Sequence, residues 1–169
     1  MSVRYIAAAA AVVLGGCAVG PRAVPVSLPY DRAAYDGYRA IGKNAVTGQA
    51  FMRQQGGGTV SCAGLPVLLF PDSPYFREVI QIVARGDTPD TSNARPGQDG
   101  SPVRADRCDA QGNFAITEVP PGRWILASDV VWRAGQSIQG GTLARGIEVV
   151  DGGENRFLLA GDDLQRPPR

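Results

Sequence analysis

The chain of 169 residues contains no histidine and only one lysine, Lys43. Without histidine it lacks the commonest general base and the commonest metal ligand of proteins. A serine nucleophile would need a neighbouring base, and no buried lysine is evident to replace histidine in that role. The acidic residues are scattered and form no paired-carboxylate motif. We therefore expect a protein that is not an enzyme and that holds neither a metal nor another cofactor.

An excess of charge is missing as well. The chain carries 17 basic and 16 acidic side chains, which argues against binding nucleic acid through bulk charge. Long apolar runs are also missing, since the longest covers only residues 6–14. As a helix these residues would rise about 14 Å, roughly half the thickness of a hydrocarbon core. This run is therefore too short to be a membrane span.

The short apolar run has the layout of a secretory signal. Arg4 precedes it, and the small residues Gly15 and Gly16 close it in the way that a cleavage site requires. The four residues Leu14-Gly15-Gly16-Cys17 resemble the lipobox of bacterial lipoproteins. The resemblance implies cleavage of a signal peptide (residues 1–16), acylation of Cys17 and, because Ala18 follows, anchoring to the outer membrane. The alternatives are a secretory signal that is cut elsewhere and a buried apolar helix.

Two further cysteines, Cys62 and Cys108, remain once Cys17 is assigned to the lipid. Export places them in an oxidising compartment, where a disulfide is the default state. A closed loop of about 45 residues would stabilise the fold by roughly 3 to 4 kcal/mol in the chain-entropy model. The alternative is two separate buried thiols.

The segment after the lipid site, residues 17–44, contains prolines, tyrosines and charges without a period of 2 or 3.6. It is predicted to be a tether that lifts the domain off the membrane. Two alternatives stay open: its tyrosines pack back onto the domain, or residues 31–39 form a short helix. One domain is expected over residues 45–160, followed by a polar tail at residues 161–169.

In the first half of this domain, the pattern of residues predicts two strands and one inserted helix. Dense or alternating apolar residues predict strands at residues 45–53 and 65–70, with Gly48 as a candidate bulge. Apolar residues spaced i, i+3, i+4, i+7 predict a short amphipathic helix over residues 74–85, packed on the sheet. A long polar loop is expected at residues 86–102.

The second half predicts β-structure only. Strands are expected at residues 103–108, 113–117, 123–132, 142–150 and 154–159. The last two are expected to form a hairpin across Asp151-Gly152-Gly153. About seven short strands with frequent turn signals indicate a β-sandwich.

Two motifs carry a family resemblance. Asp109-Ala110-Gln111-Gly112-Asn113-Phe114 and Val119-Pro120-Pro121-Gly122-Arg123-Trp124 resemble the turns and strands of the carboxypeptidase regulatory-like domain. The resemblance implies a mainly β, prealbumin-like Greek-key sandwich related to collagen-binding B-type repeats, here with one short inserted helix. It implies a fold rather than an activity.

Two hypotheses for function follow. In the first, the domain is a binding or structural accessory module that holds an envelope protein through the apolar face of residues 76–83 or through a free sheet edge. In the second, it binds cell-wall carbohydrate or exopolysaccharide, with Trp132 and nearby tyrosines as stacking platforms. Trp124 is expected in the core, whereas Trp132 lies near a strand end and is the candidate ligand contact.

Overall fold

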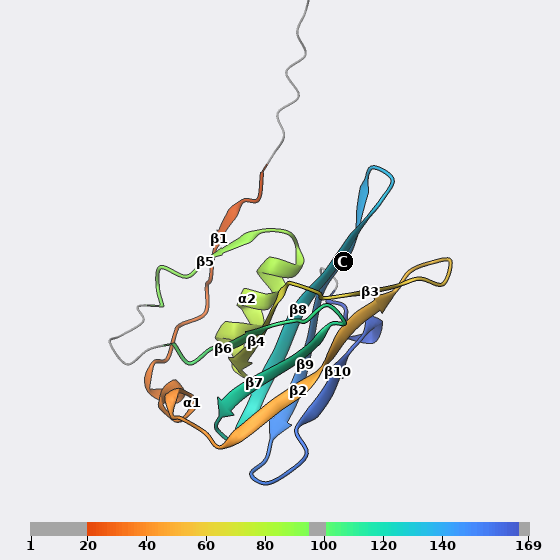
Figure 1. Cartoon of the computed structure of the whole chain (residues 1–169). Coiled ribbons are helices and arrows are strands. Elements are labelled where there is room, and N and C mark those ends of the chain that lie inside the picture. The colour runs from red at the N-terminus through yellow and green to blue at the C-terminus, as the bar shows by residue number, and fades with distance from the viewer. Residues whose placement is uncertain (1–19, 95–100, 166–169) are drawn as a thin grey trace, which may run out of the picture.

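The computed structural model describes residues 20–94 and 101–165, and Figure 1 shows their arrangement. Cys17 and the proposed signal peptide lie outside the described residues, as do residues 166–169 at the end of the tail. Two four-stranded sheets pack face to face, with one helix on the outer face of one of them. The predicted fold class, a mainly β sandwich with a short inserted helix, is confirmed.

The first sheet is built around β2, which has neighbours on both edges. β10 pairs with it in parallel, whereas β7 and β3 pair with it antiparallel. The strands of this sheet are β2 (Asn44–Arg53), β3 (Thr59–Ser61), β7 (Asn113–Val119) and β10 (Arg156–Leu159).

The second sheet has the strand order β6-β4-β8-β9 and is antiparallel throughout. Its two longest strands, β8 and β9, form a hairpin whose tip extends beyond the rest of the sandwich (Figure 1). The strands of this sheet are β4 (Pro66–Pro71), β6 (Arg104–Arg107), β8 (Gly122–Ala134) and β9 (Ser137–Val149).

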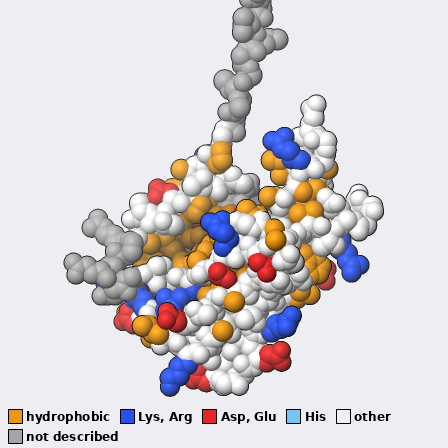
Figure 2. Space-filling model, viewed as in Figure 1, with side chains coloured by type: hydrophobic (Ala, Val, Ile, Leu, Met, Phe, Trp, Pro, Cys, Tyr) orange, Lys and Arg blue, Asp and Glu red, His pale blue; other side chains and the backbone are white. Residues whose placement is uncertain are grey.

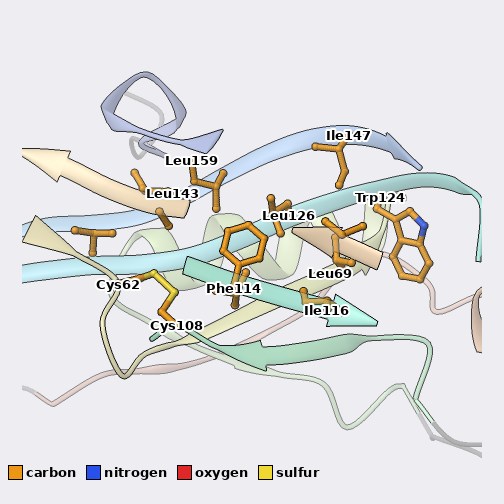
Figure 3. Close-up of a cluster of buried hydrophobic side chains, with 14 of the residues drawn as sticks. Cys62, Leu69, Cys108, Phe114, Ile116, Trp124, Leu126, Leu143, Ile147 and Leu159 are labelled. Atoms are coloured by element: carbon orange, nitrogen blue, oxygen red, sulfur yellow. A yellow bond between two sulfur atoms is a disulfide. The ribbon is translucent and has the colours of Figure 1, made fainter. Parts of the chain in front are cut away.

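The core lies between the two sheets and is filled by side chains of alternate residues in each strand. Trp124 and Leu126 of β8 are fully buried, and Phe114 and Ile116 of β7 meet them from the opposite sheet (Figure 3). The Trp124 indole N–H donates to the Pro120 carbonyl at 3.2 Å, so its polar group is satisfied inside the core.

The predicted disulfide is confirmed. Cys62 follows β3 and Cys108 follows β6, and their Cα atoms lie 5.8 Å apart. The bond joins the edge of one sheet to the edge of the other and closes the segment that contains the inserted helix (Figure 3).

The inserted helix α2 (Pro74–Ala84) begins where the sequence predicts. Ser73 caps it by accepting a hydrogen bond from the Phe76 N–H, and Pro74 occupies the first turn. Ile80 packs on the outer face of the second sheet, against residues that include Ile125 and Ala127 of β8. The other apolar side of the helix is covered by the N-terminal segment.

The tether prediction is wrong for the described residues 20–44, because this segment packs on the domain. β1 (Ala23–Pro25) pairs in parallel with β5 (Thr88–Asp90), and the short helices η1 (Ala33–Tyr35) and α1 (Asp36–Arg39) follow. Both alternatives are observed: the tyrosines pack back on the domain, and residues 33–39 are helical. Burying these aromatic rings against α2 removes more apolar surface from water than a solvated tether could.

Polar contacts secure the same segment. Arg104 donates from Nη2 to three consecutive carbonyls, those of Tyr38, Arg39 and Ala40, at 2.8 to 3.1 Å. The Asn93 side chain donates to the Val26 carbonyl at 2.9 Å. Residues 20–44 are therefore part of the folded unit.

The predicted hairpin between the last two strands is wrong. β9 ends in the second sheet, and β10 crosses to the first sheet to pair with β2. Asn155 organises the crossing: its side chain accepts from the Val150 N–H and donates to the Val150 carbonyl. These hydrogen bonds satisfy the polar groups of the loop, and the strand that follows places Leu159 in the core.

The bulge expected at Gly48 is also misplaced, since the register shift lies between Asn44 and Val46. Gly48 is paired on both edges of β2, with Phe157 and with Phe114. A Cβ atom at this position would overlap the Phe157 carbonyl and lie 2.7 Å from the Phe114 ring. The glycine therefore serves a close approach of neighbouring strands.

The start of the polar tail is folded too. η2 (Gly161–Asp163) is followed by Leu164, which forms a bridge with Leu143 of β9, and the Gln165 N–H donates to the Thr142 carbonyl at 2.9 Å. Residues 161–165 thus belong to the domain rather than to a free tail.

Candidate functional site

An open groove of about 670 Å³ lies where the β8–β9 hairpin leaves the sandwich. One wall is the end of β2 with the turn that follows it, and the other is the inward face of the hairpin. We call it the Trp132 groove. Its lining residues are Met52, Arg53, Gln54, Gln55, Trp132, Ala134, Gln139, Gly140 and Leu164.

Trp132 reaches the groove because it continues the inward register of β8. Trp124 and Val130 have the same parity and are fully buried, whereas Trp132 lies past the end of the core and is half-buried. The ring therefore packs on the core with one part and borders the groove with another.

Gly140 leaves room for this ring. It has a φ of +89°, and a Cβ atom there would lie 2.8 Å from a carbon of the Trp132 ring. A side chain at this position would therefore collide with the indole or with the nearby backbone. Gln139, the cross-strand partner of Trp132, supplies the neighbouring polar group of the groove.

The rim of the groove carries amides and one guanidinium. In the described part of the chain, the side chains of Arg53, Gln55 and Gln139 form no hydrogen bond or ion pair, so their donors and acceptors are free for a ligand. Backbone hydrogen bonds from Gln54 N–H to the Gly58 carbonyl, 2.7 Å, and from Gly57 N–H to the Gln54 carbonyl, 3.1 Å, hold the turn that presents them.

The sequence identified one residue of this groove, Trp132, and missed its polar partners. The tyrosines expected beside Trp132 lie elsewhere. Tyr30 packs on Tyr35 and Tyr75, with ring centroids 4.9 and 5.1 Å away, and Tyr38 packs on Trp124 at 4.8 Å. The run Arg53-Gln54-Gln55 before three glycines was the available signal, because polar residues at a strand end lie at the end of the sandwich.

The apolar helix face proposed as a docking surface is not free. Phe76, Val79 and Ile82 are buried in a cluster with Val26 and Tyr35 of the N-terminal segment. Burial raises the pKa of Tyr35 above its usual value, although its hydroxyl donates to Ser73 Oγ at 2.8 Å. This face of α2 is therefore part of the fold.

A second, smaller hollow of about 270 Å³ lies between α2 and the outer face of the β8–β9 pair. Arg77, Gln81 and Arg145 border it together with apolar side chains. It contains no aromatic ring. Among residues 20–94 and 101–165, no His, Cys, Asp and Glu side chains gather in a group that could hold a metal ion. The same residues include no helix of sufficient length and apolarity to cross a membrane.

Comparison with known proteins identifies a fold. No protein-family model and no curated protein sequence matches the chain. A solved structure from Pseudomonas aeruginosa, described as that of a candidate carbohydrate-binding protein, matches with a TM-score of 0.62 and 19% identity. The match covers 78% of this chain and 97% of the other. This likeness shows that the two chains share a fold. Because one fold hosts unrelated functions, it does not by itself identify an activity.

Proposed function

We propose that this chain is a non-catalytic binding module, anchored to the bacterial outer membrane through acylated Cys17, that binds carbohydrate in the Trp132 groove. The observation that carries the proposal is the half-buried Trp132 ring beside side-chain amides and a guanidinium without partners of their own. Sugar rings have C–H faces that pack on aromatic rings and hydroxyls that bond with such groups. The description of the Pseudomonas aeruginosa protein supports the same ligand class.

The anchoring part of the proposal rests on the lipobox-like residues Leu14-Gly15-Gly16-Cys17. The absence of histidine from the whole chain supports a role in binding rather than in acid–base catalysis. The resemblance to carboxypeptidase regulatory-like domains supports a non-catalytic module as well.

Titration calorimetry with soluble peptidoglycan strands and with bacterial exopolysaccharide fragments tests the ligand class. We expect one of the two to bind, and Trp132→Ala to weaken binding about tenfold, since aromatic stacking contributes on the order of 1 kcal/mol beyond area burial. Gln139→Ala should also weaken binding. Gln136→Ala is the matched control, because Gln136 lies in the turn of the same hairpin and does not border the groove.

Unchanged affinity in Trp132→Ala, or binding of neither glycan, would contradict the carbohydrate proposal.

A second candidate, an accessory module for an envelope protein, is favoured by one observation. β10 lies at the end of its sheet with β2 as its neighbour, and no strand of the described residues pairs with its other edge, where Arg145 donates to the Leu158 carbonyl at 3.4 Å. Crosslinking in intact cells should then capture a single envelope protein. Replacing Leu158 of β10 with proline should abolish that capture.

A further inference from the structure

The tip of the β8–β9 hairpin, residues 131–140, exposes apolar side chains. Ile138 is 72% exposed and Val131 is 45% exposed. Val131 and Arg133 share a face of β8, and Ile138 is the cross-strand partner of Arg133. All three side chains therefore lie on the face opposite Trp132, outside the groove.

The charge of this region has one sign. Between Asp129 and Glu148 the sequence contains Arg133 and Arg145 and no acidic residue. Figure 2 shows basic and apolar side chains side by side on the hairpin. An apolar tip with a cationic side chain matches the acyl and anionic headgroup regions of a bilayer.

The hairpin points the same way as the start of the described chain. In Figure 1 the tip and the segment before β1 both lie at the same end of the molecule. Gly20 is three residues from Cys17, a distance that even an extended chain limits to about 11 Å. The end of the domain that bears the tip is therefore the end nearest to Cys17.

The N-terminal segment is firmly attached to the domain at this end. Pairing of β1 with β5 and the hydrogen bonds that Ser27 and Leu28 donate to Glu78 fix its path. Little free chain is left between the acylation site and the folded unit, so the lipid would restrict how the domain turns against the membrane.

We propose that the hairpin tip, through Val131, Arg133 and Ile138, forms a second contact with the membrane that carries acylated Cys17. This inference rests on the acylation in the proposed function but not on carbohydrate binding. It orients the domain with the tip in the interfacial region of the bilayer and the loop that contains Ile41 away from it.

An environment-sensitive label tests this contact. The acylated full-length mature protein is prepared with Ile138→Cys or, as the matched control, with Ile41→Cys, which replaces an isoleucine that is 81% exposed. Ile41 belongs to the loop between α1 and β2, which lies at the other end of the sandwich (Figure 1). With Cys17 acylated and Cys62 bonded to Cys108, the introduced thiol is the one available for a nitrobenzoxadiazole label. The proteins are reconstituted in vesicles of equal parts phosphatidylethanolamine and phosphatidylglycerol.

We expect the emission of the label at position 138 to shift to shorter wavelength and to be quenched by nitroxide-bearing lipids, with neither effect at position 41. In the unlabelled protein, which retains Ile138, hydrogen exchange of residues 131–138 should be slower in vesicles than without them. This protection should be lost in Val131→Asp/Ile138→Asp and retained in Val150→Asp/Ile41→Asp, whose valine is similarly exposed at 48%. The aspartates are surface substitutions, so folding is not at risk.

Equal label responses at positions 138 and 41 would overturn the proposal. So would an intact mass that shows Cys17 without acyl groups, which would also remove the anchoring part of the proposed function. Failure of glycan binding, measured in detergent without vesicles, would leave the tip contact standing. The two proposals therefore fail separately.

Discussion

Glu78 of α2 holds Ser27 of the N-terminal segment through two hydrogen bonds to one oxygen. Its Oε1 accepts from the Ser27 N–H at 3.0 Å and from the Ser27 hydroxyl at 2.7 Å, while Oε2 accepts from the Leu28 N–H at 2.9 Å. Partial burial raises the pKa of Glu78, but these hydrogen bonds outweigh it and hold the pKa below the usual range. The carboxylate thus joins the lipid-proximal segment to the helix.

Glu78→Gln should loosen this segment. The substitution removes one charged acceptor, which we expect to cost about 1 kcal/mol of folding free energy after allowance for solvent screening. Hydrogen exchange of residues 26–30 should speed up, whereas Glu154→Gln, at an exposed carboxylate of the β9–β10 loop, should change nothing. Equal exchange in both variants would contradict this role of Glu78.

The same contact should depend on pH. Because the folded-state pKa of Glu78 is lowered, its stabilisation is fully present above the unfolded pKa, roughly 4.3, and is lost as pH falls through the folded value. Urea unfolding should therefore show a smaller difference between wild type and Glu78→Gln in more acidic solution. A difference that stayed constant down to low pH would count against the assignment.

Asp72 should stabilise the fold through its contacts with two arginines. Hydrogen bonds from Arg77, at 2.7 and 3.0 Å, and the charges of Arg77 and Arg123 lower the pKa of its carboxyl despite burial. Asp72→Asn should lower the free energy of unfolding by about 1 kcal/mol at neutral pH. The loss is no larger because both arginines are largely exposed to solvent. The cost should shrink as pH falls through the folded pKa; Asp162→Asn, at an exposed carboxylate, is the control.

Removing the disulfide should destabilise the fold strongly. Its half-cystines are 46 residues apart, and the chain-entropy model assigns about 4 kcal/mol to a loop of this size. Urea unfolding of Cys62→Ser/Cys108→Ser should show a loss of this order. A reducing agent should then have no further effect on the variant, and a strong residual effect would indicate another cause.

Gly48→Ala should destabilise the first sheet. The added methyl group would overlap the Phe157 carbonyl, and relief requires β10 or Phe114 to move, at a cost of roughly 1 to 3 kcal/mol. Gly146→Ala is the matched control, because Gly146 also lies in a strand and a Cβ atom there meets nothing within 4 Å. Similar thermal midpoints for the two variants would show that β10 accommodates the change.

Local patterns in the sequence were sufficient for α2 and for the longer strands, but not for the short strands β1, β3 and β5. The spacing of apolar residues located α2 to within one residue at its C-terminal end, since that pattern reflects one buried face. The parity of Trp124, Leu126 and Val130 identified the buried face of β8, and the even pair of cysteines identified the disulfide. Each of these inferences depends on neighbours along the chain or on a count of residues.

Contacts between distant residues decided the rest. A segment rich in proline and tyrosine has no periodicity, and only the presence of α2 provides the surface on which Tyr30 and Tyr35 pack. The partner of β10 also depended on tertiary structure, because a turn of Asp151-Gly152-Gly153 suits a hairpin and a crossing equally, and burial of Leu159 between the sheets selects the crossing. The groove depended on the packing of the two sheets, which brings Trp132 of one sheet near Arg53 of the other, a proximity that no spacing along the chain encodes.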